Sequence, residues 1–204
     1  MEWRFAGHQY DILGTWHLYA WDLFGWSTDY GNWFGRSIST NSIDYARNFV
    51  DWGTQIGDGE TWYTLSSAEW DYVFNRRTDA NNKWSTCEVN GVHGLILLPD
   101  TWTLPAGLTF NRYDSSRHIV YTAAEWEQME AAGAVFLPEA GYRNGTTMYE
   151  TNIDGYYWSS TPSYYNNCAY CINKFHQCGY GEGYYISNRY YGHSVRLVKD
   201  YQGN

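Results

Sequence analysis

The residues best suited to metal chemistry lie within eleven positions near the end of the chain. These soft ligands are Cys168, Cys171, His176 and Cys178. The first pair has the spacing of a zinc knuckle, and four such ligands would complete a tetrahedral zinc site. His176 and Cys178 are only two positions apart, which is closer than the usual second pair. We therefore expect no metal and no other cofactor. We favour a disulfide between two of these three cysteines. Together with Cys87 the chain has four cysteines, which could form two disulfides in three different ways.

The same cysteines belong to a segment, residues 163–193, whose composition is that of a binding surface. Its 31 residues include eight Tyr, four Asn and four Gly, but no Leu, Val or Met. A segment so poor in aliphatic residues cannot build a core. Tyr gives a large contact area at low entropic cost and Asn and Ser give adaptable hydrogen bonds, which is why antibody paratopes favour this mixture. The sequence predicts a ligand-binding surface, with a Tyr-rich surface loop as the alternative.

No catalytic motif accompanies this segment. The chain contains no G-x-S-x-G, no H-E-x-x-H and no phosphate-binding glycine motif. Its conspicuous carboxylates fall on expected helical faces, where a solvated or capping role is the usual one. They are Asp71, Glu125, Glu127 and Glu130. We therefore expect that the protein is not an enzyme.

Composition limits the remaining classes of partner. A chain of 204 residues suits one domain, residues 1–204, that buries about 70% of its unfolded surface. The net charge is −9 without a Lys/Arg cluster, which argues against nucleic acid and anionic membranes as partners. No run of 18 apolar residues indicates a transmembrane helix, and no signal peptide opens the chain. We expect no membrane insertion.

Two short amphipathic helices are predicted to pack against the core. The first has a capping box between Ser66 and Glu69 and continues to about Arg77. The second begins with a similar box at Thr122 and ends at Gly133. Helical spacing predicts a buried face made by Trp70, Val73, Phe74, Trp126, Met129 and Ala132.

The other elements are strands that hold the binding segment at both ends. Strands are expected at 92–98, 119–121, 134–137, 156–160, 169–173, 184–187 and 194–199. Gly, Asn and Pro between them favour hairpins in a mainly antiparallel sheet. Aromatics make up 20% of the residues while the mean hydropathy is −0.59, which indicates an α+β domain with long polar connections. Residues 25–60 are expected to be irregular.

Six ordered blocks of the sequence resemble a known family. They are WRFAGHQYDILG (3–14), AWDLFGWST (20–28), TWYTLSSAEWDYVFNRR (61–77), VFLPEAGYRNGT (135–146), GYYWSST (155–161) and GHSVRLVKD (192–200). They resemble a family of Bacteroidales surface and phage proteins with a C-type-lectin-like fold. This family overlaps with the variable proteins of diversity-generating retroelements. The resemblance implies an α+β, C-type-lectin-like fold and a location on a virion surface or a bacterial cell surface.

The resemblance also implies which residues vary. Such retroelements mutate adenines, so an AAC codon for asparagine can become Tyr, Ser, Cys, His, Asp, Gly or Ile. Most non-scaffold positions of residues 163–193 fit this set. The exceptions are Lys174, Gln177 and Glu182, which would be fixed by the template. The expected ligand-binding residues are Tyr164, Tyr165, Asn166, Asn167, Cys171, Asn173, His176, Tyr184, Tyr185, Ser187, Asn188, Tyr190, Tyr191 and His193.

The resemblance places Tyr170 in the fixed pattern. Because neighbouring side chains of a strand point to opposite faces, Tyr170 and Ile172 are then expected to point one way, and Cys171 and Asn173 outward. The outward side chains should join the other expected binding residues in a single exposed patch.

These inferences predict a non-enzymatic binding protein that displays a diversified, Tyr-rich surface. Its ligand would be a protein or glycan on a target cell. The first alternative is an invariant surface or adhesion domain of the same family. The second is an enzyme related to the formylglycine-generating enzymes, whose resemblance falls on LSSAEWDYVF (65–74) and on no catalytic residue. Calcium-dependent lectins of this fold carry Glu-Pro-Asn or Gln-Pro-Asp and Trp-Asn-Asp, strings that the chain lacks, although Tyr could still stack on a sugar without metal.

Overall fold

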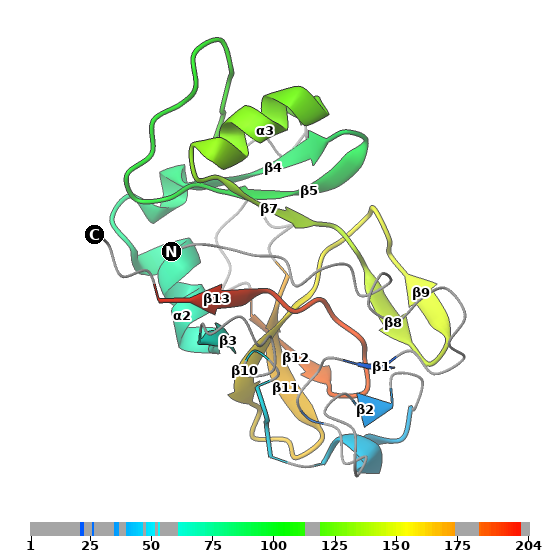
Figure 1. Ribbon diagram of the computed structural model, residues 1–204. Helices are drawn as coiled ribbons and strands as arrows, with labels where there is room; N and C mark the ends of the chain where they lie inside the picture. Colours follow the sequence, from blue (N-terminus) through cyan, green and yellow to red (C-terminus); the bar gives the residue numbers. More distant parts are fainter. Residues whose placement is uncertain are drawn as a thin grey trace.

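Short antiparallel sheets and a few short helices build the part of the chain that the structure describes (Figure 1). The computed structural model describes residues 21, 22, 26, 35, 36, 40–46, 48–51, 53, 61–112, 119–173 and 184–200. The strands are β1 (Trp21–Asp22), β2 (Gly35–Arg36), β3 (Trp62–Thr64), β4 (Trp84–Val89), β5 (Val92–Leu97), β6 (Val120–Tyr121), β7 (Val135–Pro138), β8 (Tyr142–Asn144), β9 (Thr147–Tyr149), β10 (Tyr157–Pro162), β11 (Cys168–Ile172), β12 (Tyr184–Asn188) and β13 (Leu197–Lys199). The helices are α2 (Ser67–Asp71) and α3 (Ala123–Ala131), with a π-helical turn η3 (Tyr72–Arg76) and 3₁₀ turns η1 (Ser42–Tyr45) and η4 (Ala80–Asn82). The predicted α+β class and mainly antiparallel pairing are confirmed.

The largest sheet has four strands in the order β6-β4-β5-β7. Asn90 and Gly91, both at positive φ, make the two-residue turn between β4 and β5, as an Asn-Gly hairpin requires. β7 pairs antiparallel with β5, and β6 pairs parallel with β4. This sheet forms the upper half of the molecule in Figure 1, together with α3.

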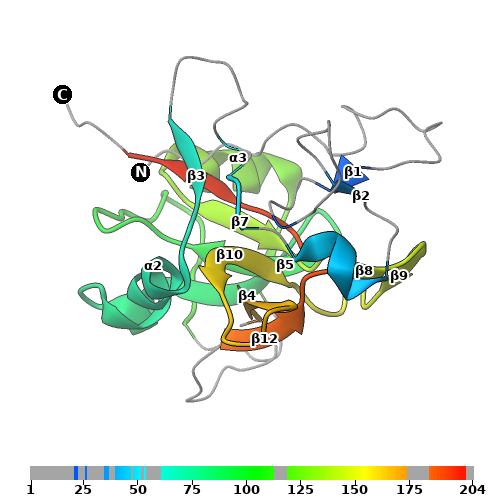
Figure 2. The ribbon, with the colours of Figure 1, turned by 90° about the horizontal axis from the view of Figure 1, so that it is seen from below.

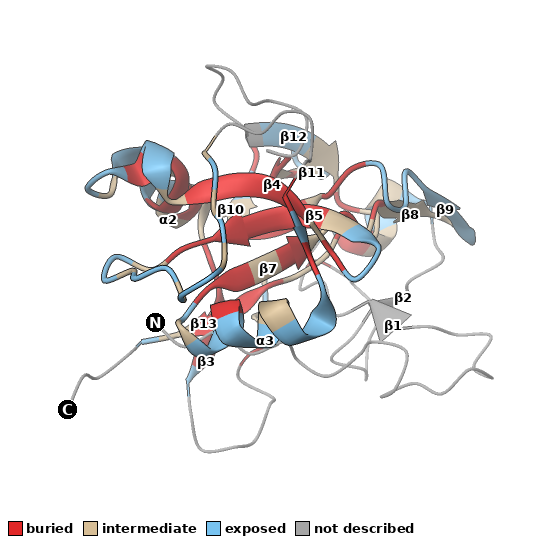
Figure 3. Cartoon of the chain, turned by 90° about the horizontal axis from the view of Figure 1, so that it is seen from above, coloured by how far each residue is buried: buried red, intermediate tan, exposed pale blue. Residues whose placement is uncertain are grey.

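Apolar clusters cover both faces of this sheet, and most of β4 and β5 is buried, as the red colour in Figure 3 shows. Leu95 of β5 belongs to one apolar cluster with Trp70 and Phe74, which come from α2 and η3. The next residue, Ile96, belongs to a second cluster with Met129 of α3. Alternate side chains along a strand point to opposite faces, so the sheet separates α2 from α3.

The helix ends confirm the sequence predictions. Ser66 Oγ accepts from the amide of Glu69 at 3.2 Å, while the Glu69 carboxylate accepts from the Ser66 amide at 2.7 Å. Thr122 and Glu125 form the same capping box at α3. Gly133 follows α3 with φ +94°, a conformation that favours glycine after a helix. Of the six side chains predicted to be buried, Trp70, Val73, Phe74 and Met129 are fully buried and Trp126 and Ala132 are half-buried.

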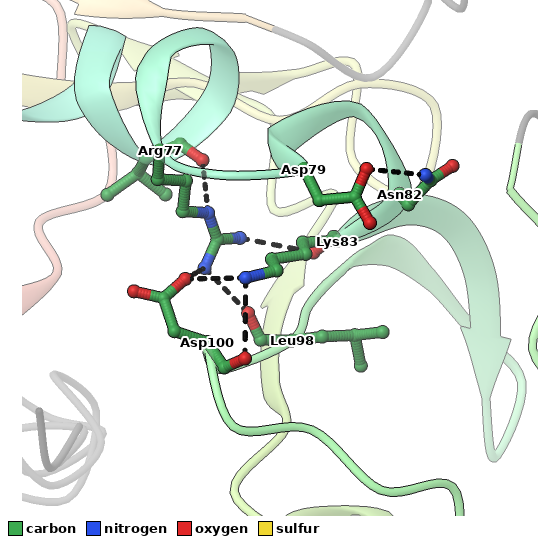
Figure 4. Close-up of polar contacts among 7 residues, drawn as sticks. Arg77, Asp79, Asn82, Lys83, Leu98 and Asp100 are labelled. Carbon is green, nitrogen blue, oxygen red and sulfur yellow. Dashed lines mark hydrogen bonds and ion pairs between the residues drawn. The ribbon is translucent and has the colours of Figure 1, made fainter.

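A buried arginine joins η3 to the end of β5 (Figure 4). The Arg77 guanidinium donates to the carbonyl oxygens of Val73 and Leu98 at 2.7 Å each and of Lys83 at 3.2 Å. Lys83 Nζ lies 2.8 Å from the carboxylate of Asp100. Burial lowers the pKa of Arg77. The three carbonyls would lack these donors without Arg77.

A second sheet, in the order β10-β11-β12, lies in the lower half of Figure 1. β13 pairs antiparallel with β3, and the two strands lie side by side in Figure 2. One face of the β10-β11-β12 sheet contributes Trp158 to a third apolar cluster, which also includes Trp26 and Tyr45.

The expected strands appear with shifted ends. Those at 92–98, 119–121, 134–137, 156–160, 169–173 and 184–187 correspond to β5, β6, β7, β10, β11 and β12, and their ends differ by at most two residues. The strand expected at 194–199 is shorter, and β1, β2, β3, β4, β8 and β9 were not predicted. Residues 25–60, expected to be irregular, include β2 and η1. Most of residues 25–60 lie outside the described residues. No helix within the described ranges has the length and apolarity needed to cross a membrane.

Candidate ligand-binding surface

The binding segment supplies the central strand of the β10-β11-β12 sheet. Trp158 of β10 pairs with Cys171 of β11, and Cys171 pairs in turn with Tyr185 of β12. Cys168, at the start of β11, pairs with Asn188. Directly paired residues point to the same face of a sheet, so this register fixes which side chains lie together.

The loop between β10 and β11 carries the most exposed tyrosines of the segment. Tyr164 is 72% exposed and Tyr165 is 52% exposed, and their ring centroids are 4.1 Å apart. Asn166 and Asn167 are also exposed, and Asn167 Nδ2 lies 3.4 Å from Asn188 Oδ1. We call these five residues, Tyr164, Tyr165, Asn166, Asn167 and Asn188, the loop surface.

Backbone hydrogen bonds hold the loop surface in place. The amide of Ser163 donates to the Cys168 carbonyl at 3.2 Å, and the amide of Cys168 donates to the Tyr165 carbonyl at 2.9 Å. Ser163 is buried, and its Oγ accepts from the Tyr165 amide at 3.2 Å. The exposed rings therefore rise from a closed turn. A hydrogen bond to Tyr165 is the main reason that the pKa of Tyr164 is raised.

Arg189 joins the loop to the third apolar cluster. Its Nε donates to the Cys168 carbonyl at 2.9 Å, its Nη1 donates to the Tyr45 carbonyl at 3.3 Å, and its guanidinium carbon lies 4.0 Å from the ring centroid of Trp26. The residue is 5% exposed, and burial lowers its pKa. Arg189 was not among the predicted site residues, although a single arginine in a Tyr-rich segment was a signal for it.

The predicted outward positions of β11 are wrong. Cys171 is 1% exposed and lies in the third apolar cluster, and burial raises the pKa of its thiol. Ile172 is also 1% exposed but lies in the first cluster, so both faces of β11 are covered at this point. Asn173 is buried too, and its Nδ2 donates to Asp154 Oδ2 at 2.7 Å. The alternation of side chains along a strand separates buried from exposed positions only where one face of the sheet is in contact with solvent.

His193 is a further correction, because it is buried. Its ring centroid lies 4.3 Å from that of Trp158 and 5.1 Å from that of Tyr156. Its Nε2 lies 2.8 Å from Ser187 Oγ, whereas its buried Nδ1 has no hydrogen-bond partner among the described residues. Burial lowers the pKa of His193 to about 3, so the ring is neutral at physiological pH.

The expected binding residues therefore do not form a single patch. Tyr185 and Ser187 pair with Cys171 and Ala169 on the covered face of the sheet, although the Tyr185 side chain is 41% exposed at its edge. Asn188 points to the opposite face. Tyr190 and Tyr191 are half-buried against the third apolar cluster. His176 lies outside the described residues, and so does the side chain of Tyr184.

The cysteines of β11 do not converge. Cys168 and Cys171 are three positions apart on a strand, so their thiols point to opposite faces. The sulfur of Cys168 lies 3.5 Å from Asn188 Oδ1, and neither cysteine forms a disulfide with any described residue. His176 and Cys178 lie outside the described residues. Among the residues that are described, no group of three His, Cys, Asp or Glu could hold a metal ion.

A second group of aromatic residues contains His193, and its assembly was not predicted from the sequence. We call it the Tyr142 cluster: Tyr142, Tyr149, Tyr156, Tyr191 and His193. The ring of Tyr142 is central, with centroids 5.2 Å from Tyr191 and 5.3 Å from both Tyr149 and Tyr156. The cluster joins the β8–β9 hairpin to the end of the binding segment.

Comparison of the chain with protein-family models, curated proteins and solved structures gives no match.

Proposed function

We propose that this protein is a non-enzymatic binding protein whose loop surface contacts the ligand. The observation that carries the proposal is the exposed pair Tyr164 and Tyr165, which project from a turn closed by Ser163 and Cys168. Ordering an interface side chain on binding costs free energy, and a preorganised loop reduces that cost. Tyrosine adds a large contact area with few rotatable bonds.

The scaffold in this proposal is a single C-type-lectin-like domain over residues 1–204, and the loop surface is diversified by a retroelement. The six-block resemblance supports both statements, and the α+β, antiparallel architecture is compatible with them. The ligand is a protein or glycan on a target cell, and the protein acts on a virion surface or a bacterial cell surface. An invariant adhesion domain with the same loop surface is the second candidate.

Two described thiols support a binding function over the enzyme alternative. Formylglycine-generating enzymes use a reactive cysteine pair, and reactivity needs the thiolate. Cys87 and Cys171 are 0% and 1% exposed, and burial raises the pKa of each thiol. Both are therefore protonated core residues, and burial also raises the pKa of the half-buried Cys168 thiol.

The gene tests diversification. We expect a near-identical template repeat beside a reverse transcriptase gene, differing from the coding sequence only at template adenines. The differences should fall in the codons for residues 164–167 and 188, and should spare those of Trp158 and Arg189. A locus without the repeat would rule out the retroelement, and so would differences spread over the scaffold.

Binding is tested with arrayed glycans and intact Bacteroidales cells as probes. The Tyr164→Ala, Tyr165→Ala double variant should lose at least about tenfold in affinity for any probe that the protein binds, since tyrosines are common hot spots. Tyr72→Ala is the matched control, because Tyr72 is 53% exposed on η3. Equal affinity of the double variant and the wild type would reject the loop surface as the site.

A further inference from the structure

The Tyr142 cluster is open to solvent at one end and closed at the other. Tyr149 of β9 is 42% exposed, and the whole of β9 is exposed (Figure 3). Tyr142, Tyr156 and Tyr191 are half-buried, and His193 is buried beneath them. A row of touching rings that reaches the surface offers π faces to a ligand. Since His193 is neutral, its ring adds no positive charge to the cluster.

A carboxylate lies at the edge of these rings. Glu150 follows Tyr149 and is exposed, and its Oε2 accepts from the Tyr156 hydroxyl at 2.6 Å. Its Oε1 accepts no hydrogen bond from any described residue. The Tyr156 hydroxyl also lies 3.4 Å from Asp154 Oδ2. Exposed ring faces beside a carboxylate oxygen favour the binding of a cationic group at this site.

The backbone fixes this arrangement. Gly141 approaches β9 so closely that a Cβ there would lie 2.0 Å from the Tyr149 carbonyl oxygen. Arg143 and Gly192 exchange two backbone hydrogen bonds of 2.9 Å, which holds the hairpin against the end of the binding segment. The Arg143 guanidinium donates to the Gly145 carbonyl, and Arg143 lies on the opposite face of β8 from Tyr142. The Arg143 guanidinium lies against Gly192, on the inner side of the cluster near His193, so the cation is at the closed end and not at the exposed end formed by Tyr149 and Glu150.

We propose that the Tyr142 cluster and Glu150 form a docking site for an arginine side chain of a protein partner. A guanidinium is planar, stacks on aromatic faces and can donate to a carboxylate in the same plane, whereas an ammonium is a compact, strongly hydrated charge. The chain itself places the Arg189 guanidinium 4.0 Å from the Trp26 ring centroid. The net charge of −9 further favours a basic partner. This site is separate from the loop surface and does not depend on it.

The test uses the full chain and two peptides of equal charge and length, one alternating Arg with Gly and the other alternating Lys with Gly. Calorimetry in about 0.15 M salt limits nonspecific attraction, since the Debye length is then about 8 Å. We expect saturable binding of the Arg peptide and at least about fivefold weaker binding of the Lys peptide. Equal affinity for the two peptides would show general charge attraction and overturn the proposal. Absence of saturable binding would overturn it as well.

Three variants locate the site. Tyr149→Ala and Glu150→Gln should each weaken Arg-peptide binding at least about threefold, consistent with the loss of one ring face or one charge-assisted contact. Met148→Ala is the matched control, because Met148 is 48% exposed at the next position of the same strand and points to its other face. An equal effect of all three variants would overturn the proposal.

The loop-surface double variant separates this site from the proposed function. Tyr164→Ala, Tyr165→Ala should leave Arg-peptide binding unchanged. If it abolishes that binding, the arginine site is not the Tyr142 cluster, while the loop surface still stands as a binding site. If it changes only glycan or cell binding, both proposals hold.

Discussion

Tyrosine rings of residues 163–193 differ in what they contact. Tyr164 and Tyr165 contact each other and solvent, whereas Tyr190 and Tyr191 pack against the cluster around Trp158. Composition indicated that the segment carries exposed tyrosines, because a run with no Leu, Val or Met cannot build a core. It could not separate the exposed rings from the packed ones, since the packing partners Trp26 and Tyr45 are distant in sequence.

Substitution at the exposed pair should hardly affect stability. Tyr164→Ala and Tyr165→Ala should each leave the midpoint of thermal unfolding within about 2 °C of the wild type, as surface changes do. Trp158→Ala should cost about 2–5 kcal/mol, because Trp158 is 0% exposed and its removal leaves a cavity. Calorimetric melts compare the two sets. Similar losses in both would mean that the loop belongs to the core.

The buried imidazole of His193 predicts a pH dependence of stability. Its pKa is about 3 in the folded protein and about 6.5 in the unfolded chain, so below pH 6.5 the unfolded state binds a proton that the folded state does not. This group therefore has no effect above pH 6.5, and it lowers the unfolding free energy as pH falls from 6.5 toward 3, by up to about 1.4 kcal/mol per pH unit. His193→Gln should remove that part of the slope in urea titrations at pH 7, 6 and 5. An unchanged slope would contradict the prediction.

At the scale of elements, the sequence predicted helix starts better than strand faces. The capping boxes at Ser66 and Thr122 are local, so four residues suffice to recognise each one. β4 was missed because its sequence, WSTCEV, lacks polar alternation: Ser85 and Thr86 are buried with their neighbours in a sheet covered on both faces. The wrong orientation of Cys171 and Asn173 has the same cause.

The junction between η3 and β5 provides a matched pair of arginines. The Arg77 side chain is 8% exposed and donates to three carbonyls, whereas the Arg76 side chain is 74% exposed and pairs with Asp71. Arg77→Ala should cost about 2–4 kcal/mol, because it removes charge-assisted hydrogen bonds to buried acceptors. Arg76→Ala should stay within about 1 kcal/mol, as exposed pairs do. Chemical denaturation of both variants checks this, and equal costs would reject the role of Arg77.

At the scale of the molecule, segments that are distant in sequence form contacts that no local sequence pattern predicts. The Tyr142 cluster joins β8, β9, the start of β10 and residues 191–193, and the bridge between Arg143 and Gly192 brings them together. Tyr142 and Tyr156 lie in blocks assigned to the scaffold, Tyr149 lies between two blocks, and Tyr191 belongs to the binding segment. Long-range contacts of this kind depend on the register of the whole fold, and so the cluster could not be predicted.

The whole fold should also be independent of metal. Cys168 and Cys171 point to opposite faces of β11, and Cys171 is enclosed by apolar side chains. Treatment with EDTA should therefore leave the melting temperature within about 2 °C of the untreated protein. Stoichiometric zinc in the purified protein, or a large drop in melting temperature, would instead identify a structural zinc site.

The position of Arg189 between Asn188 and Tyr190 has a consequence for codon choice. If adenines in this stretch are mutated, an AGA codon could become a glycine or stop codon and an AGG codon a glycine or tryptophan codon, and the loop would lose the guanidinium that joins it to Trp26 and Tyr45. A CGT, CGC or CGG codon contains no adenine and is immune, as is the TGG codon of Trp158. Sequencing the gene should therefore show Arg189 encoded by one of these CGN codons, beside adenine-rich codons in the template for Tyr164 and Tyr165. The codon would then keep arginine at the position where its side chain holds the loop against Trp26 and Tyr45.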